Sequence, residues 1–151
     1  MTRYPVLQVD AFTATPLRGN PAAVVLDAAG LTDETMQAIA REMNLSETAF
    51  VSAPQTDTAD YAARFFTPAK EIPLPGHPII ATAQALADTG RWAPDPGRVL
   101  RLETRRGVVP VTHRNDEPGP DDVPASQAFD RLNPNNCRHS GYPCDNRTGR
   151  G

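Results

Sequence analysis

Glu47 is the first residue of the sequence that could perform acid–base chemistry. It lies in the stretch NLSETAFV at 44–51, between the expected end of a helix and the start of a strand. Apolar neighbours such as those that follow it disfavour the ionised form of a carboxyl group. That property suits a carboxyl group that removes and returns a proton. A solvated glutamate at the start of a strand is the alternative interpretation.

Gly76 and His77 form the second candidate, at the expected start of an apolar helix. The first amides of a helix have no internal partner, so they can bind a carboxylate or another developing negative charge. Gly76 permits close approach to the backbone, and His77 could donate a proton or a hydrogen bond there. A helix-start turn with a surface histidine is the alternative. Asn20, in the sequence GNP at 19–21, could face a ligand or form an ordinary turn.

The sequence predicts no metal and no cofactor. Cys137, His139 and Cys144 have a Cys-x6-Cys spacing that lacks a short knuckle, and no fourth ligand accompanies them. The sequence contains no phosphate-binding glycine loop, no HExxH and no GxSxG.

Composition and charge exclude several classes of partner. The chain has 151 residues, enough for one ordinary domain, and its formal net charge is −3. Because nucleic-acid binders usually have a basic face, we expect no nucleic-acid partner. No apolar run approaches the ~20 residues that span a bilayer, and no signal peptide is apparent at the N-terminus. We therefore expect a cytoplasmic protein without a membrane partner.

The composition changes near residue 115 and divides the chain into a folded domain, 1–115, and a tail, 116–151. The tail has three large aliphatic or Phe residues (Val123, Phe129 and Leu132) among five prolines and four glycines. Such a segment buries too little apolar surface to offset its ordering entropy, so we expect it to be disordered. The abrupt change also suggests a truncated or frame-shifted product.

Within the domain, hydrophobic periodicity and turn residues predict an α+β fold with a central helix. Helices are expected from Thr32 to Asn44 and from Pro78 to Asp88. Strands are expected at 6–12, 22–26, 48–51, 61–66, 98–104 and 108–113, and the proline-containing segment 67–75 is expected to be irregular. The last two strands form a hairpin around 105–107.

Five blocks, in this order, resemble the N-terminal half of the phenazine-biosynthesis PhzF-like isomerase family. They are DAF at 10–12, GNPAAV at 19–24, NLSETAFV at 44–51, RFFTP at 64–68, and GHP at 76–78 with ATA at 81–83. The resemblance covers about residues 5–113. It implies a diaminopimelate-epimerase-like fold with two similar halves. Each half is a curved mixed sheet wrapped around a central helix, and the active site lies between them.

The resemblance also implies roles for the candidate residues. Glu47 matches the family's catalytic glutamate, which moves a proton between carbon atoms without metal, nucleotide or pyridoxal. Gly76 and His77 match the loop that lines the substrate pocket, and Ser46 beside the glutamate is expected to contact the substrate, as is Asn20. The implied partner is a small carboxylate-bearing molecule. In the family's best-known reaction it is a dihydro-hydroxyanthranilate.

Differences from the family pattern leave an alternative open. Related racemases use one thiol from each half, and the absence of cysteine before Cys137 excludes that chemistry for this half. Pro75 stands where relatives often have a small residue, and the second half of the family has no counterpart in the tail. We therefore expect the chain to be weakly active or inactive alone. The alternative is a non-catalytic half-domain or fragment that pairs with another chain, a homodimer included.

Overall fold

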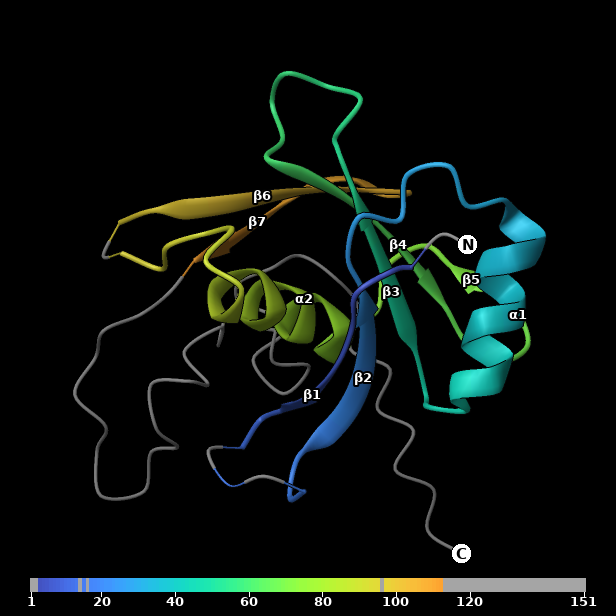
Figure 1. Ribbon diagram of the computed structural model, residues 1–151. Helices are drawn as coiled ribbons and strands as arrows, with labels where there is room; N and C mark the ends of the chain where they lie inside the picture. The colour runs from blue at the N-terminus through green and yellow to red at the C-terminus, as the bar shows by residue number, and fades with distance from the viewer. Residues whose placement is uncertain (1–2, 14, 16, 96, 113–151) are drawn as a thin grey trace, which may run out of the picture.

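A computed structural model describes residues 3–13, 15, 17–95 and 97–112, which form one mixed sheet and two helices (Figure 1). In chain order the elements are β1 (Val6–Ala11), β2 (Asn20–Val25), α1 (Asp33–Met43), β3 (Thr48–Ser52), β4 (Tyr61–Phe66), β5 (Glu71–Ile72), α2 (His77–Asp88), β6 (Val99–Thr104) and β7 (Gly107–Thr112). The α+β fold expected from the sequence is thereby confirmed.

The strands follow the order β1-β2-β3-β4-β6-β7, and β5 pairs with β4 beside this path. The β2–β3 and β4–β6 pairs are parallel, and the other pairs are antiparallel. At the start of β4, Tyr61 and Ala62 pair with β6. At the end of the same strand, Phe65 and Phe66 pair with β5. One edge of β4 therefore serves two different strands.

The two helices pack on opposite faces of the sheet (Figure 1). On one face, α2 contributes Ile79 and Leu86 to the larger core, where they pack with residues from six strands such as Val24 and Phe65. On the other face, α1 covers a smaller core in which Met36 and Ala40 pack near Phe50. Eight of the twelve α2 residues are buried, as expected for a central helix.

Local signals in the sequence explain the bounds of α1. The Thr32 side chain accepts a hydrogen bond from the Thr35 N–H at 3.2 Å and caps the helix. Asp33 and Glu34 place negative charge in the first turn, near the positive end of the helix dipole. Asn44 ends the helix in the left-handed conformation, with φ at 51°.

Several details differ from the expectations. Segment 67–75 is not wholly irregular, because Glu71 and Ile72 form β5 against β4. The β6–β7 turn consists of Arg105 and Arg106 alone, since Gly107, with a φ of 107°, already pairs with Thr104. β2 begins at Asn20 rather than at residue 22. The expected tail at 116–151, with its cysteines, lies outside the described residues.

Candidate functional site

Glu47 lies on the short connection between α1 and β3, and the backbone holds it against β2. The left-handed Asn44 donates its N–H to the Ala40 carbonyl at 3.2 Å and turns the chain out of α1. Three residues later the Glu47 carbonyl accepts the Ala23 N–H at 3.2 Å. Thr48 then begins β3 paired with Ala23. The position of Glu47 is therefore fixed by its own main chain.

His77 is the first residue of α2, and it follows the exposed Gly76 at the cap position. No side chain in the described part of the chain caps this helix start, whereas Thr32 caps α1. Pro78 suits the first turn because it has no N–H that would need a partner. Helix α2 contacts both β2 and β3. It therefore lies against the strand that precedes the Glu47 segment in the chain and the strand that follows it (Figure 1).

The side chains of Ser46, Glu47 and His77 meet at one ring nitrogen. The Nε2 atom of His77 lies 3.2 Å from Glu47 Oε2 and 3.3 Å from Ser46 Oγ. The side chains of Glu47 and His77 are 18% and 11% exposed, so both are sheltered and neither is sealed. Glu47 Oε2 is itself buried, and among the described residues it has no aligned hydrogen bond.

The surroundings of the His77 imidazole favour its neutral form. Burial lowers the pKa of His77 below its ordinary value of 6.5. The charge of Glu47 and a hydrogen bond to the Pro21 carbonyl act in the opposite direction, but burial is the larger effect. A neutral imidazole has one donor and one acceptor nitrogen, so the ring can accept a hydrogen bond as well as donate one.

Asn20 is exposed at the start of β2, where it pairs with Ala11. Its neighbour Pro21 reaches the site through its backbone carbonyl, which hydrogen-bonds to the His77 ring. Sequence reasoning chose Asn20 for its side chain and missed Pro21. The only signal for Pro21 was its membership of the same turn sequence, because a backbone acceptor has no residue-type signature.

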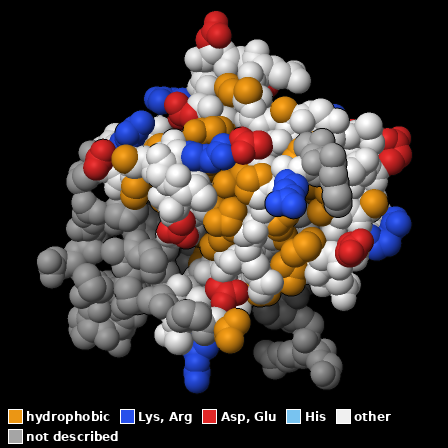
Figure 2. Space-filling model, in the orientation of Figure 1, with side chains coloured by type: hydrophobic (Ala, Val, Ile, Leu, Met, Phe, Trp, Pro, Cys, Tyr) orange, Lys and Arg blue, Asp and Glu red, His pale blue; other side chains and the backbone are white. Residues whose placement is uncertain are grey.

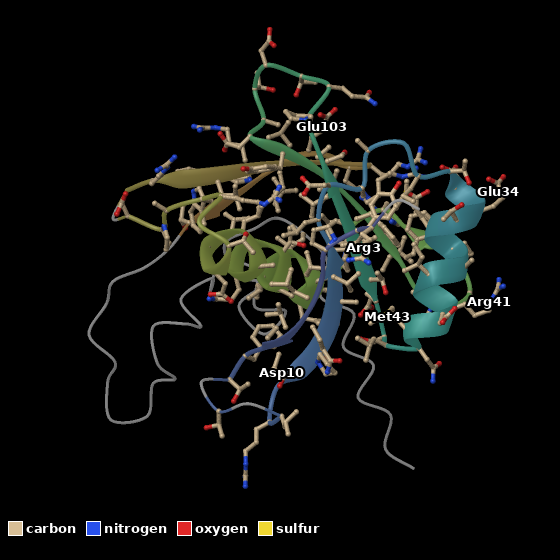
Figure 3. All side chains as sticks on the ribbon, in the orientation of Figure 1. Arg3, Asp10, Glu34, Arg41, Met43 and Glu103 are labelled. Atoms are coloured by element: carbon tan, nitrogen blue, oxygen red, sulfur yellow. The ribbon has the colours of Figure 1, made fainter. Side chains whose placement is uncertain are left out.

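A separate hollow of about 340 Å³ lies elsewhere on the sheet, lined in part by Arg64, Glu103 and Arg105. Figure 3 shows Glu103 in the upper part of the view, well above Met43, which precedes the Glu47 connection. The charged groups of the hollow already bind neighbours. Both arginines bind Glu71, and Glu103 accepts the Gln55 N–H at 2.7 Å. The Glu47–His77 pair is therefore the better candidate for chemistry.

Neither helix in the described part of the chain is long and apolar enough to span a bilayer. Across residues 3–112, apart from the few undescribed positions, no group of three His, Cys, Asp or Glu side chains is arranged to hold a metal ion.

The chain is similar to proteins of a known family. The profile of a family described as "Phenazine biosynthesis-like protein" matches residues 9–129, which extends past the domain boundary expected at 115. The chain is 51% identical over 111 residues to trans-2,3-dihydro-3-hydroxyanthranilate isomerase of Pseudomonas aeruginosa. That match covers 73% of this chain and 37% of the relative, so the chain spans less than two fifths of the relative's length.

Solved structures show the same likeness. A Bacillus anthracis phenazine biosynthesis protein of the PhzF family superposes with a TM-score of 0.67 at 41% identity, over 74% of this chain and 36% of that one. A hydroxyproline epimerase from Agrobacterium vitis superposes with a TM-score of 0.58 at 16% identity, over 74% of this chain and 38% of that one. The second likeness concerns the fold alone, and it places the sheet and central helix in the epimerase-like class.

Proposed function

The chain belongs to the phenazine biosynthesis-like protein family, and we propose that it contributes the acid–base residues of a cofactor-independent isomerase. The proposed substrate is a small carboxylate-bearing molecule of the kind named for the Pseudomonas aeruginosa relative, trans-2,3-dihydro-3-hydroxyanthranilate. Glu47 is the proposed catalytic residue. Ser46, Gly76, His77 and Asn20 are the proposed substrate-binding residues.

In the proposed reaction, Glu47 takes a proton from one carbon of the substrate and returns it to another. The electron pair of the broken C–H bond moves into the substrate and shifts a double bond, so neither atoms nor electrons are exchanged with a cofactor. Such a transfer needs a carboxyl group within hydrogen-bond distance of the substrate. The Oε2 atom supports this role, because no aligned hydrogen bond from the described residues occupies its lone pairs, which leaves them free to take up a proton.

The observation that carries the proposal is the 3.2 Å contact between Glu47 Oε2 and His77 Nε2 at the uncapped start of α2. A substrate carboxylate at this helix start would find backbone donors and the positive end of the helix dipole. The neutral ring of His77 would sit between that anion and Glu47. Substrate binding and proton transfer would thus both occur beside the first turn of α2.

Deuterium exchange tests the proposal without requiring efficient turnover. The full chain is incubated with trans-2,3-dihydro-3-hydroxyanthranilate in D₂O, and carbon-bound deuterium is measured by mass spectrometry. We expect slow incorporation that is lost in Glu47→Gln and retained in Glu42→Gln, a matched change at an exposed residue of α1. Equal incorporation in the wild type and Glu47→Gln would contradict the proposal. So would an absence of incorporation together with no effect of the compound on the His77 ring resonances.

Exposed apolar residues support a second candidate, a half-domain that functions by pairing with another chain. Val108 of β7 and Val6 of β1 are exposed on the two strands that end the strand order, and Phe12 follows β1 directly. Figure 2 shows apolar side chains gathered near the middle of one face, with charged side chains around them. Such patches commonly mark protein–protein contacts. A monomeric solution mass together with strong amide-exchange protection across β1 and β7 would contradict this candidate.

A further inference from the structure

Three groups lie near the His77 ring and could form hydrogen bonds with it: the Pro21 carbonyl, the Ser46 hydroxyl and the Glu47 carboxyl group. The Pro21 carbonyl oxygen can only accept a hydrogen bond, because it carries no proton. Neutral His77 has a single N–H to give, and its Nε2 atom faces both Ser46 Oγ and Glu47 Oε2. Of these groups, the Ser46 hydroxyl is the one that can always donate. If Nε2 accepts from Ser46, the single N–H of the ring lies on Nδ1, and Glu47 Oε2 receives no hydrogen bond from the ring.

We propose that Ser46 is a positioning residue that donates its hydroxyl proton to His77 Nε2, 3.3 Å away, and so keeps the N–H of the neutral ring on the other nitrogen, Nδ1. This inference rests on the proposed use of Glu47 as proton carrier. With Nε2 held as an acceptor, an ionised Glu47 would face a lone pair at 3.2 Å, whereas a protonated Glu47 could donate to it. Ser46 thereby keeps the ring N–H away from the nitrogen that faces Glu47.

The consequence can be measured on the histidine itself. A hydrogen bond donated to the neutral ring disfavours its charged form, so removing that bond should raise the titration midpoint of His77. Glu47, on the α1–β3 connection, is the ionisable group whose charge acts on the pKa of His77. The other two influences on this pKa are burial of the ring and the hydrogen bond to the Pro21 carbonyl. Because Ser46 is exposed and water can partly replace it, we expect a rise of roughly half a pH unit in Ser46→Ala.

The experiment is a long-range ¹H–¹⁵N spectrum of the histidine rings of the full chain, recorded across a pH titration without ligand. The spectrum of His77→Gln identifies the His77 signals. We expect the wild-type ring to carry its proton on Nδ1, and Ser46→Ala to raise the midpoint. Ser46→Thr, which keeps the hydroxyl, should restore the wild-type midpoint.

Thr48→Val is the matched control, because it removes a nearby hydroxyl that has no hydrogen bond among the described residues. It should leave the His77 midpoint unchanged. A wild-type ring protonated on Nε2, or a midpoint in Ser46→Ala that is unchanged or lower, would overturn the inference. Since no substrate is used, such a result would leave the isomerase proposal intact. Conversely, a failure of the deuterium-exchange test would not alter the tautomer.

Discussion

Glu71 is the carboxylate on which a charged network converges, and its replacement should weaken the fold in a pH-dependent way. Arg64 donates to both Glu71 oxygens at 2.8 and 2.9 Å, and Arg105 donates to both at 3.0 Å. Arg64 also binds Asp33 of α1 at 2.7 Å. The network thus joins α1, β4, β5 and the β6–β7 turn. We expect Glu71→Gln to break it while keeping the side-chain volume.

The magnitude follows from the pKa of Glu71. The hydrogen bonds from Arg64 are the main cause that lowers this pKa from 4.5 to about 2. Such a shift corresponds to at most about 3 kcal/mol of stabilisation. The Glu71 and Arg105 side chains are 22% and 55% exposed, so solvent screens the interaction. We therefore expect Glu71→Gln to lower the free energy of unfolding by about 1–2 kcal/mol at neutral pH.

The sign of the pH dependence is fixed because the folded-state pKa of Glu71 lies below its unfolded-state value. The stabilisation is fully present above about pH 4.5 and is lost as the pH falls toward 2. Urea unfolding followed by circular dichroism across this range measures it. Wild type should lose more stability with acid than Glu71→Gln does. Glu42→Gln, an exposed change of the same kind, should behave as wild type. Identical acid dependence in Glu71→Gln and wild type would refute the reasoning.

Three further substitutions test single contacts, each by urea unfolding. Thr48→Val should raise the free energy of unfolding by about 1 kcal/mol, because the fully buried Thr48 hydroxyl has no hydrogen bond among the described residues. Leu86→Ala should lower it by about 2–5 kcal/mol, since Leu86 is fully buried in the core around α2. Thr32→Ala should lower it by about 1 kcal/mol through loss of the α1 cap, and Thr32→Ser should restore it.

The bounds of the helices were predictable because short-range chemistry determines them. Thr32, the two acidic residues after it and Asn44 each act within one turn of α1. Pro78 similarly indicates where α2 begins. Both helices are found where the sequence predicts them, and five of the six expected strands match within one residue at each end.

Strand β5 was not predictable, because long-range contacts produce it. Proline residues around 67–75 predict an irregular segment. In the structure, Glu71 is held by Arg64 of β4 and by Arg105 of the β6–β7 turn, which is 34 residues away along the chain. Glu71 and Ile72 then pair with Phe66 and Phe65 and form a two-residue strand. Tertiary contacts here override the local pattern.

The candidate site shows the same division between short-range and long-range information. Residue type alone identifies Glu47 and His77 as candidates, but nothing local states that they meet, since 30 residues separate them in sequence. β2 brings them together through its backbone: the Ala23 N–H holds the Glu47 carbonyl, and the Pro21 carbonyl holds the His77 ring. Because main-chain groups make both contacts, side-chain changes in β2 should preserve the pair as long as the strand keeps its register. The 3.2 Å contact therefore depends more on the β2–β3 register than on any one side chain outside the site.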